Sequence, residues 1–407
     1  MADIDFSQYL SPFSLLPAEL IETIISFMDL SSIKATRLTC KVLCIPSTPH
    51  LVPPHFHSFA HCPDSNRLLQ ISRHPIFSLS IKTLELNLGE FNEYRARHNT
   101  YFSQITRDPE TRVAEAEEAW FQYSKLKSLR EEYAPWMCDQ TILSEVFRSL
   151  PNLSALSVSM VNFPLPNEPE LALLASIWKI PSTRLLRREL TKERFTNVLS
   201  SLLPSVENLK LKNLSHDCLP FEFFAQNKTL IESMTPIFHK LTDLRLVLDY
   251  SDTPNDLHSQ QALANLATCL QAAATLENLN LCFQSRRKID ITSLLENLLS
   301  NSIFSHLQSL HIEGLASAFY PLEQFLRSLA PNLQVLEFGG AGCHGPNQLS
   351  NGGIHLLDGR FLELFKNVEE ALGDSLTKFV VRGDLVEVDG GDAWFLDREV
   401  GWHGVIN

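Results

Sequence analysis

The chain has 407 residues, of which 44% are hydrophobic and 20% charged, a globular composition that can bury a large core. Its 34 Lys and Arg against 47 Asp and Glu give a formal charge of -13. Because such an excess of acid repels a phosphate backbone, we expect no nucleic-acid partner. Asp3 and Asp5 stand where a signal peptide carries basic residues, and no apolar run reaches membrane-spanning length. We therefore expect a cytoplasmic and/or nuclear protein without a membrane partner.

Residues 15–41, "LLPAELIETIISFMDLSSIKATRLTCK", predict two short helices. Pro17 suits the first position of a helix, where its missing N–H costs nothing, and Glu19 lies in the first turn, where the helix dipole favours an acid. Asp29 interrupts the pattern, and Ser31 or Ser32 can cap a second helix. The first helix carries a broad apolar stripe made of Leu20, Ile21, Ile24, Ile25 and Met28. We predict a helical unit over residues 1–48, with a stripe wider than two helices can cover.

Residues 49–76 are rich in proline and histidine and predict a connector. Potential zinc ligands gather in and just before this segment: Cys44, His50, His55, His57, His61 and Cys62. Their spacing matches no paired C-x2-C and H-x3-H arrangement, so we expect histidines in a linker and no metal site.

An apolar-x-x-apolar-x-apolar pattern occurs eight times, starting at Ile81, Leu153, Val206, Leu241, Leu276, Leu307, Leu333 and Leu376. The last two apolar residues of each copy have strand spacing and point to one face. Segments of helical period lie between the copies. Since one strand and one helix cannot bury an apolar face alone, we predict a solenoid over residues 77–390, closed by a capping segment at 391–407.

The widest gap between copies, about residues 91–135, predicts a helical insertion. Asp108 is a plausible N-cap, Pro109 fits the first turn and Pro135 is expected to end the helix. We expect Trp120 and Phe121 to point inward from it.

The repeat pattern resembles the leucine-rich repeat, with irregular spacing between copies. The N-terminal unit resembles an F-box in an ordered set of residues: Leu16, Pro17, Glu19, Leu20, Ile24, Met28, Ile33, Arg37, Leu38, Cys40 and Lys41. Together they resemble the divergent F-box/leucine-rich-repeat proteins of filamentous fungi. The resemblance implies an α/β fold: an irregular solenoid of short parallel strands with helices on the convex side, preceded by a small all-α unit.

The resemblance also implies a function, that of a substrate-recognition subunit of a Skp–cullin–F-box ubiquitin ligase. The N-terminal helices would bind a Skp-type adaptor, and through it a cullin, while the repeats would bind an unknown protein target. The apolar residues expected to contact the adaptor are Leu16, Pro17, Leu20, Ile24, Ile25, Met28, Ile33 and Leu38. Some of these must form the core between the helices, and the sequence does not divide them.

Target binding is expected on the concave strand face, at polar residues between and after the core pairs. These residues are Lys210, Lys212, Arg245, Asn280, His311, Glu313, Glu337 and Arg382.

The chain has no G-x-S-x-G elbow, H-E-x-x-H helix or kinase signature, so we expect no enzyme, no catalytic residue and no cofactor. The alternative is a leucine-rich-repeat scaffold whose N-terminal helices only cap the solenoid.

Overall fold

The computed structural model describes residues 16–97, 109–165, 168–251, 256–285, 287–299, 304–329, 332–340, 342, 352–373 and 375–401. Asp108, the expected N-cap, and the outer parts of the predicted helical unit and capping segment (1–15 and 402–407) lie outside these residues.

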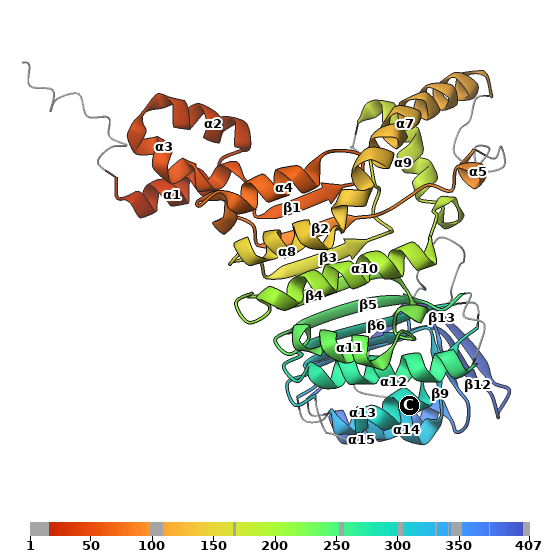
Figure 1. Cartoon of the computed structure of the whole chain (residues 1–407). Helices are drawn as coiled ribbons and strands as arrows, with labels where there is room; N and C mark the ends of the chain where they lie inside the picture. Colours follow the sequence, from red (N-terminus) through yellow and green to blue (C-terminus); the bar gives the residue numbers. More distant parts are fainter. Residues whose placement is uncertain are drawn as a thin grey trace, which may run out of the picture.

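A single parallel-stranded sheet runs through the molecule (Figure 1). Its longer ladder has the order β1-β2-β3-β4-β5-β6-β8-β10-β12, and β7, β9 and β11 form a shorter parallel ladder that joins β12. The strands of the longer ladder are β1 His55–Phe59, β2 Thr83–Asn87, β3 Ala155–Ser159, β4 Asn213–Pro220, β5 Asp243–Asp249, β6 Asn278–Gln284, β8 Ser309–Glu313, β10 Val335–Phe338 and β12 Lys378–Glu387. The shorter ladder adds β7 Ile289–Asp290, β9 Leu315–Ser317 and β11 Ile354–Leu356.

Helices cover one face of the sheet in a row, and most of them pack against the next helix along the row (Figure 1). They are α4 Asp64–Arg73, α8 Gln140–Ser149, α10 Arg188–Leu202, α11 Lys228–Met234, α12 Asp256–Ala272, α13 Thr292–Leu299, α14 Phe319–Ser328 and α15 Phe361–Leu372. Alternate strand residues such as Leu84 and Leu86 point into the core beneath them, while Glu85 points to the other face, which we call the helix-free face. This architecture confirms the predicted irregular leucine-rich-repeat-type solenoid.

Seven of the eight sequence patterns coincide with strands, and the copy at Val206 does not. Residues 209–212 precede β4, whose first two buried residues are Leu214 and His216. The repeat frame therefore starts at Leu211 and places a histidine at the last core position, which a search for apolar residues passes over.

The predicted connector at 49–76 is also wrong, because β1 and α4 form a complete first repeat there. β1 pairs in register with β2, and its Phe56 and Ser58 occupy the core positions. A short 3-10 turn, Pro49–Leu51, is what connects this repeat to the N-terminal helices.

The insertion contains α5 Glu93–Ala96 and α7 Pro109–Met137. A helix from later in the chain, α9 Ala172–Trp178, packs against α7. Pro135 lies inside α7 and does not end it. These elements form a second small core around Phe91, Trp120 and Trp178. Trp120 is buried as predicted, whereas Phe121, the next residue around α7, is exposed.

The capping segment forms β13 Ala393–Gly401, which pairs antiparallel with β12. It hydrogen-bonds along the outer side of the last repeat and forms the edge strand at the C-terminal end of the longer ladder.

Candidate protein-binding surfaces

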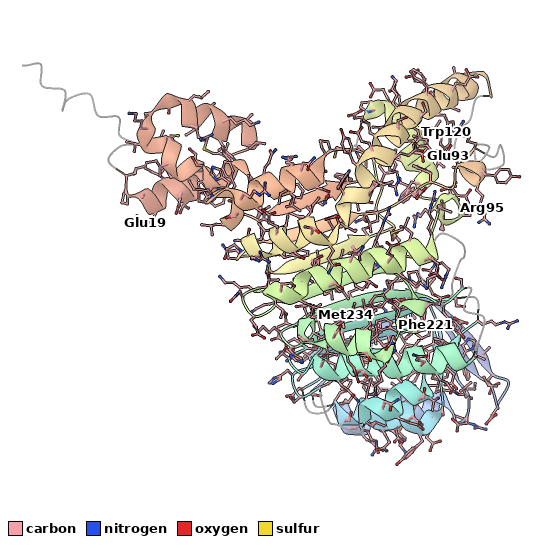
Figure 2. The ribbon with its side chains drawn as sticks, viewed as in Figure 1. Glu19, Glu93, Arg95, Trp120, Phe221 and Met234 are labelled. Atoms are coloured by element: carbon pink, nitrogen blue, oxygen red, sulfur yellow. The ribbon has the colours of Figure 1, made fainter. Side chains whose placement is uncertain are left out.

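The N-terminal unit consists of α1 Ala18–Ser26, α2 Leu30–Thr39 and α3 Lys41–Ser47, and α3 packs against both of the others. Figure 2 shows Glu19 on α1, well away from Phe221 and Met234 within the solenoid. The carboxylate of Asp29 caps α2, since its Oδ1 accepts hydrogen bonds from Ser32 N at 2.8 Å and Ser31 Oγ at 2.6 Å. These bonds, the one from Ser31 above all, lower the pKa of Asp29 to about 2.

The unit has a very small core. Ile21, Ile25 and Ile33 are buried, and a few side chains pack partly buried against them: Leu16, Met28, Leu43 and Leu51. The solenoid core begins separately at Val52 and Phe56. The most extensive contacts between the two parts run through the turn Pro49–Leu51. The helices therefore adjoin the solenoid without sharing its core.

Large apolar side chains remain exposed over the whole unit. Leu20 and Ile24 on α1 and Phe27 at its C-cap follow at i, i+4 and i+7 and form one stripe, with exposed fractions of 51%, 41% and 85%. The others are Leu30, Leu38, Val42 and Ile45. Exposed apolar side chains gathered in so small a unit indicate an interaction surface.

The structure thus divides the residues predicted to contact an adaptor. Pro17, Leu20, Ile24 and Leu38 are exposed. Leu16 and Met28 are half-buried, and Ile25 and Ile33 belong to the core between the helices. Four further exposed apolar residues were not predicted: Phe27, Leu30, Val42 and Ile45. The spacing of seven residues between Leu20 and Phe27 could have revealed Phe27.

A second surface lies on the helix-free face, where the strand register aligns the middle residue of each repeat. We call this set the polar row: His57, Glu85, Ser157, Ser215, Arg245, Asn280, His311 and Glu337. The row has mixed charge and its members are exposed or half-buried, apart from Glu85. It offers hydrogen-bonding groups of both kinds to a partner.

Four of the eight residues predicted to contact a target belong to the polar row: Arg245, Asn280, His311 and Glu337. Arg382 lies in β12, two residues after Val380, which pairs with Glu337, so it occupies the same face. Lys210 and Lys212 are exposed but precede β4, and Ser215 takes the position assigned to them. Glu313 is buried, and its Oε1 accepts a hydrogen bond from Gly342 N at 2.8 Å.

The C-terminal part of the polar row is tied together by polar contacts. His311 Nδ1 lies 3.1 Å from Asn280 Nδ2 and 3.6 Å from Glu337 Oε2. Lys378 Nζ lies 2.6 Å from Glu337 Oε1, and this bond lowers the pKa of the Glu337 carboxyl below its usual value. Held in this way, the side chains present a surface that is already ordered before a partner binds.

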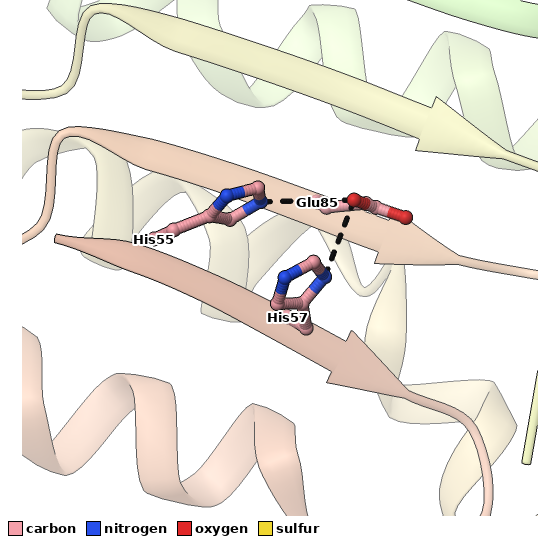
Figure 3. A group of neighbouring side chains, drawn as sticks. All are labelled: His55, His57 and Glu85. Atoms are coloured by element: carbon pink, nitrogen blue, oxygen red, sulfur yellow. Dashed lines mark ion pairs between the residues drawn. The ribbon is translucent and has the colours of Figure 1, made fainter. Parts of the chain in front are cut away.

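Two groups of side chains within the described residues have the geometry to hold a metal ion: His55, His57 and Glu85, and Cys282, His311 and Glu313. Figure 3 shows the first group, in which both histidines approach one carboxylate. In the second group, Glu313 Oε2 lies 3.2 Å from His311 Nε2 and 3.6 Å from Cys282 Sγ, and the three residues are buried or half-buried. Glu85 was missed from the sequence because it lies on a different strand from the histidines.

Within the part of the chain that the structure describes, no helix combines the length and apolar character needed to cross a membrane.

No protein-family model matches the chain, and no curated protein matches it either. Two solved structures are similar over most of their length. The leucine-rich repeat-containing protein LegL7 from Legionella pneumophila is 13% identical, with 84% of this chain and 92% of that chain covered and a TM-score of 0.27. The complex of Rad7 and Elc1 in yeast gives 13% identity, coverage of 94% and 92%, and a TM-score of 0.29. Likenesses at these TM-scores do not establish a function for this chain.

Proposed function

We propose that this chain is the substrate-recognition subunit of a Skp–cullin–F-box ubiquitin ligase, whose helical unit binds a Skp-type adaptor and whose solenoid binds a protein target. The observation that carries the proposal is the exposed stripe of Leu20, Ile24 and Phe27 on α1. Burying one such side chain contributes about 1.5–3 kcal/mol. Three of them at the centre of an interface supply the apolar anchors that a stable complex requires.

The adaptor surface is defined by the division within the helical unit. Leu20, Ile24, Phe27 and Leu38 are available to a partner, whereas Ile25 and Ile33 hold α1 and α2 together. In this proposal no residue of the chain performs chemistry, and the chain positions a target for enzymes bound elsewhere in the complex.

The test is co-elution of a purified Skp-type adaptor with the full chain in size-exclusion chromatography. We expect a complex for the unmodified protein at protein concentrations of about 10–50 µM. Ile24→Asp places a charge in the stripe and is expected to abolish it. Leu362→Asp is the matched control, because Leu362 is also an exposed apolar residue, on α15 at the far end of the solenoid.

Failure of the unmodified chain to form a complex at these concentrations refutes the proposal. So does an Ile24→Asp variant that elutes with the adaptor as well as Leu362→Asp does.

For the target, the polar row supports a binding surface of mixed charge. We expect Arg245→Glu to reverse one exposed charge there and to remove target proteins from a pull-down analysed by mass spectrometry, while adaptor binding is retained. Lys240→Glu, at an exposed residue outside the strand, is the matched control. If Arg245→Glu and Lys240→Glu lost target proteins from the pull-down to the same extent, the polar row would not be the target site.

The alternative is a scaffold whose helices only cap the solenoid, and it differs from the proposal in the melting temperature expected after the helices are deleted. If α1–α3 served as a cover, deleting residues 1–48 would expose core and lower the melting temperature by several degrees. The separate core of the helical unit favours an unchanged melting temperature instead.

A further inference from the structure

The first two strands of the sheet bring together two imidazoles and a carboxylate. His55 and His57 are two residues apart on β1, so both side chains project from the helix-free face, and His57 pairs in register with Glu85 on β2. Their rings stack with centroids 4.0 Å apart. Glu85 Oε2 lies 3.6 Å from His55 Nε2 and 3.2 Å from His57 Nδ1 (Figure 3).

These separations match those between neighbouring ligands of a small tetrahedral ion. Zinc binds imidazole nitrogen and carboxylate oxygen at about 2.0 Å, and a tetrahedron with bonds of that length has edges of about 3.3 Å. The distance from Glu85 Oε2 to His57 Nδ1 lies just below this value, and the distance to His55 Nε2 lies just above it. All three ligand atoms lie within 4.8 Å of one another.

The carboxylate is held in place from behind. The side chain of Glu85 is only 11% exposed, and its second oxygen, Oε1, accepts a hydrogen bond from Asn162 Nδ2 at 2.8 Å. This bond leaves Oε2 directed at the two rings. Support of this kind orients the ligands of metal sites and strengthens binding.

The imidazoles are exposed and suited to coordination. Their side chains are 46% and 47% exposed, so an ion can enter from solvent.

We propose that His55, His57 and Glu85 bind one Zn²⁺ ion per chain, with Asn162 as a positioning residue and a fourth coordination position open to solvent. The ion would join β1 to β2 at the start of the sheet. Its open position lies at the end of the polar row, where water or a side chain of a bound partner can complete the coordination. Zinc binding at this site does not depend on the proposed adaptor.

The test uses the full chain freed of metal with a chelator and titrated with Zn²⁺ by calorimetry at pH 7.5. We expect one equivalent to bind, His57→Ala and His55→Ala each to weaken binding at least tenfold, and Asn162→Ala to weaken it about tenfold. His239→Ala, at an exposed histidine outside the group, is the matched control and should bind like the unmodified chain. Melting temperatures of all variants establish that they are folded.

Co²⁺ serves as a spectroscopic probe of the same site. We expect the visible absorption of four-coordinate Co²⁺ without a thiolate charge-transfer band, and its loss in His57→Ala and His55→Ala. A thiolate band would place the metal on cysteines and overturn the proposal. Absence of stoichiometric Zn²⁺ binding, or unchanged affinity in both histidine variants, would overturn it as well.

Discussion

In the described part of the helical unit, three isoleucines are buried and seven large apolar side chains are exposed, whereas the solenoid behind it shares one apolar core from Val52 to Leu385. Each repeat of the solenoid packs against the next, so the apolar faces of the repeats are buried when the solenoid folds. Among the described residues, no repeat packs against the outer side of the helical unit. Its unused apolar surface is therefore available for binding, which is why the same composition gives stability in one region and recognition in the other.

The largest difference in stability between the two regions is expected when one phenylalanine in each is replaced by alanine. Phe221 is fully buried, with its ring 5.5 Å from that of Tyr250 and 6.2 Å from that of Phe283. We expect Phe221→Ala to lower the free energy of unfolding by about 3–5 kcal/mol. Phe27→Ala, at an 85% exposed residue, is expected to change it by less than about 0.5 kcal/mol. Urea denaturation measures both, and similar costs would contradict the comparison.

Adjacent isoleucines on α1 sharpen the comparison within the helical unit. Ile25→Ala removes one of three buried side chains and is expected to destabilise the unit by about 2–5 kcal/mol. Ile24→Ala should leave its stability nearly unchanged because Ile24 is 41% exposed. Hydrogen exchange of amides in 18–47 reports the loss. Equal loss of protection in the solenoid would show that the two regions share a core after all.

The solenoid should also respond to acid through His216. Complete burial against Phe195 lowers the pKa of His216 from its ordinary 6.5 to about 3. The unfolded chain therefore takes up the proton first as the pH falls below 6.5, so stability is lost on acidification. The loss from this residue is about 2 kcal/mol between pH 7 and pH 5.

His216→Leu removes this titration and is expected to flatten the pH dependence of the melting temperature between pH 7 and pH 5. Part of the dependence will remain, since burial also lowers the pKa of His61. A variant with the full dependence of the unmodified chain would exclude His216 as its source.

The smallest effect concerns the cap of α2. Asp29→Ala removes the acceptor for Ser31 and Ser32, so we expect faster amide exchange in α2 but a smaller loss than for Ile25→Ala. Asn also accepts this bond, so Asp29→Asn should exchange like the unmodified chain. Exchange in Asp29→Ala that matches the unmodified chain would show that the cap does not stabilise the unit.

The sequence was sufficient to predict the repeats wherever both core positions are apolar, because period and burial then coincide. It failed at β1 and β4, where Ser58 and His216 fill the last core position. A polar residue there is buried by its neighbours in space, and no local pattern reveals it. The placement of Lys210 and Lys212 on a strand failed for the same reason.

The division of the N-terminal stripe could not be predicted from the sequence either. Ile24 and Ile25 differ by one step around α1, and only the packing of α3 determines which of them is buried. Similarly, Glu85 meets His55 and His57 only because the strand register aligns β1 with β2.

The strand β13 has a consequence for how the molecule can associate. It hydrogen-bonds along the outer side of β12 in the antiparallel sense, so among the described strands β13 replaces β12 as the edge strand at that end of the longer ladder. At the other end, β2 is the one described strand that pairs with β1. The two ends of the longer ladder therefore offer different partners to an added strand: the repeat strand β1, beside the two histidines and the N-terminal helices, and the antiparallel strand β13.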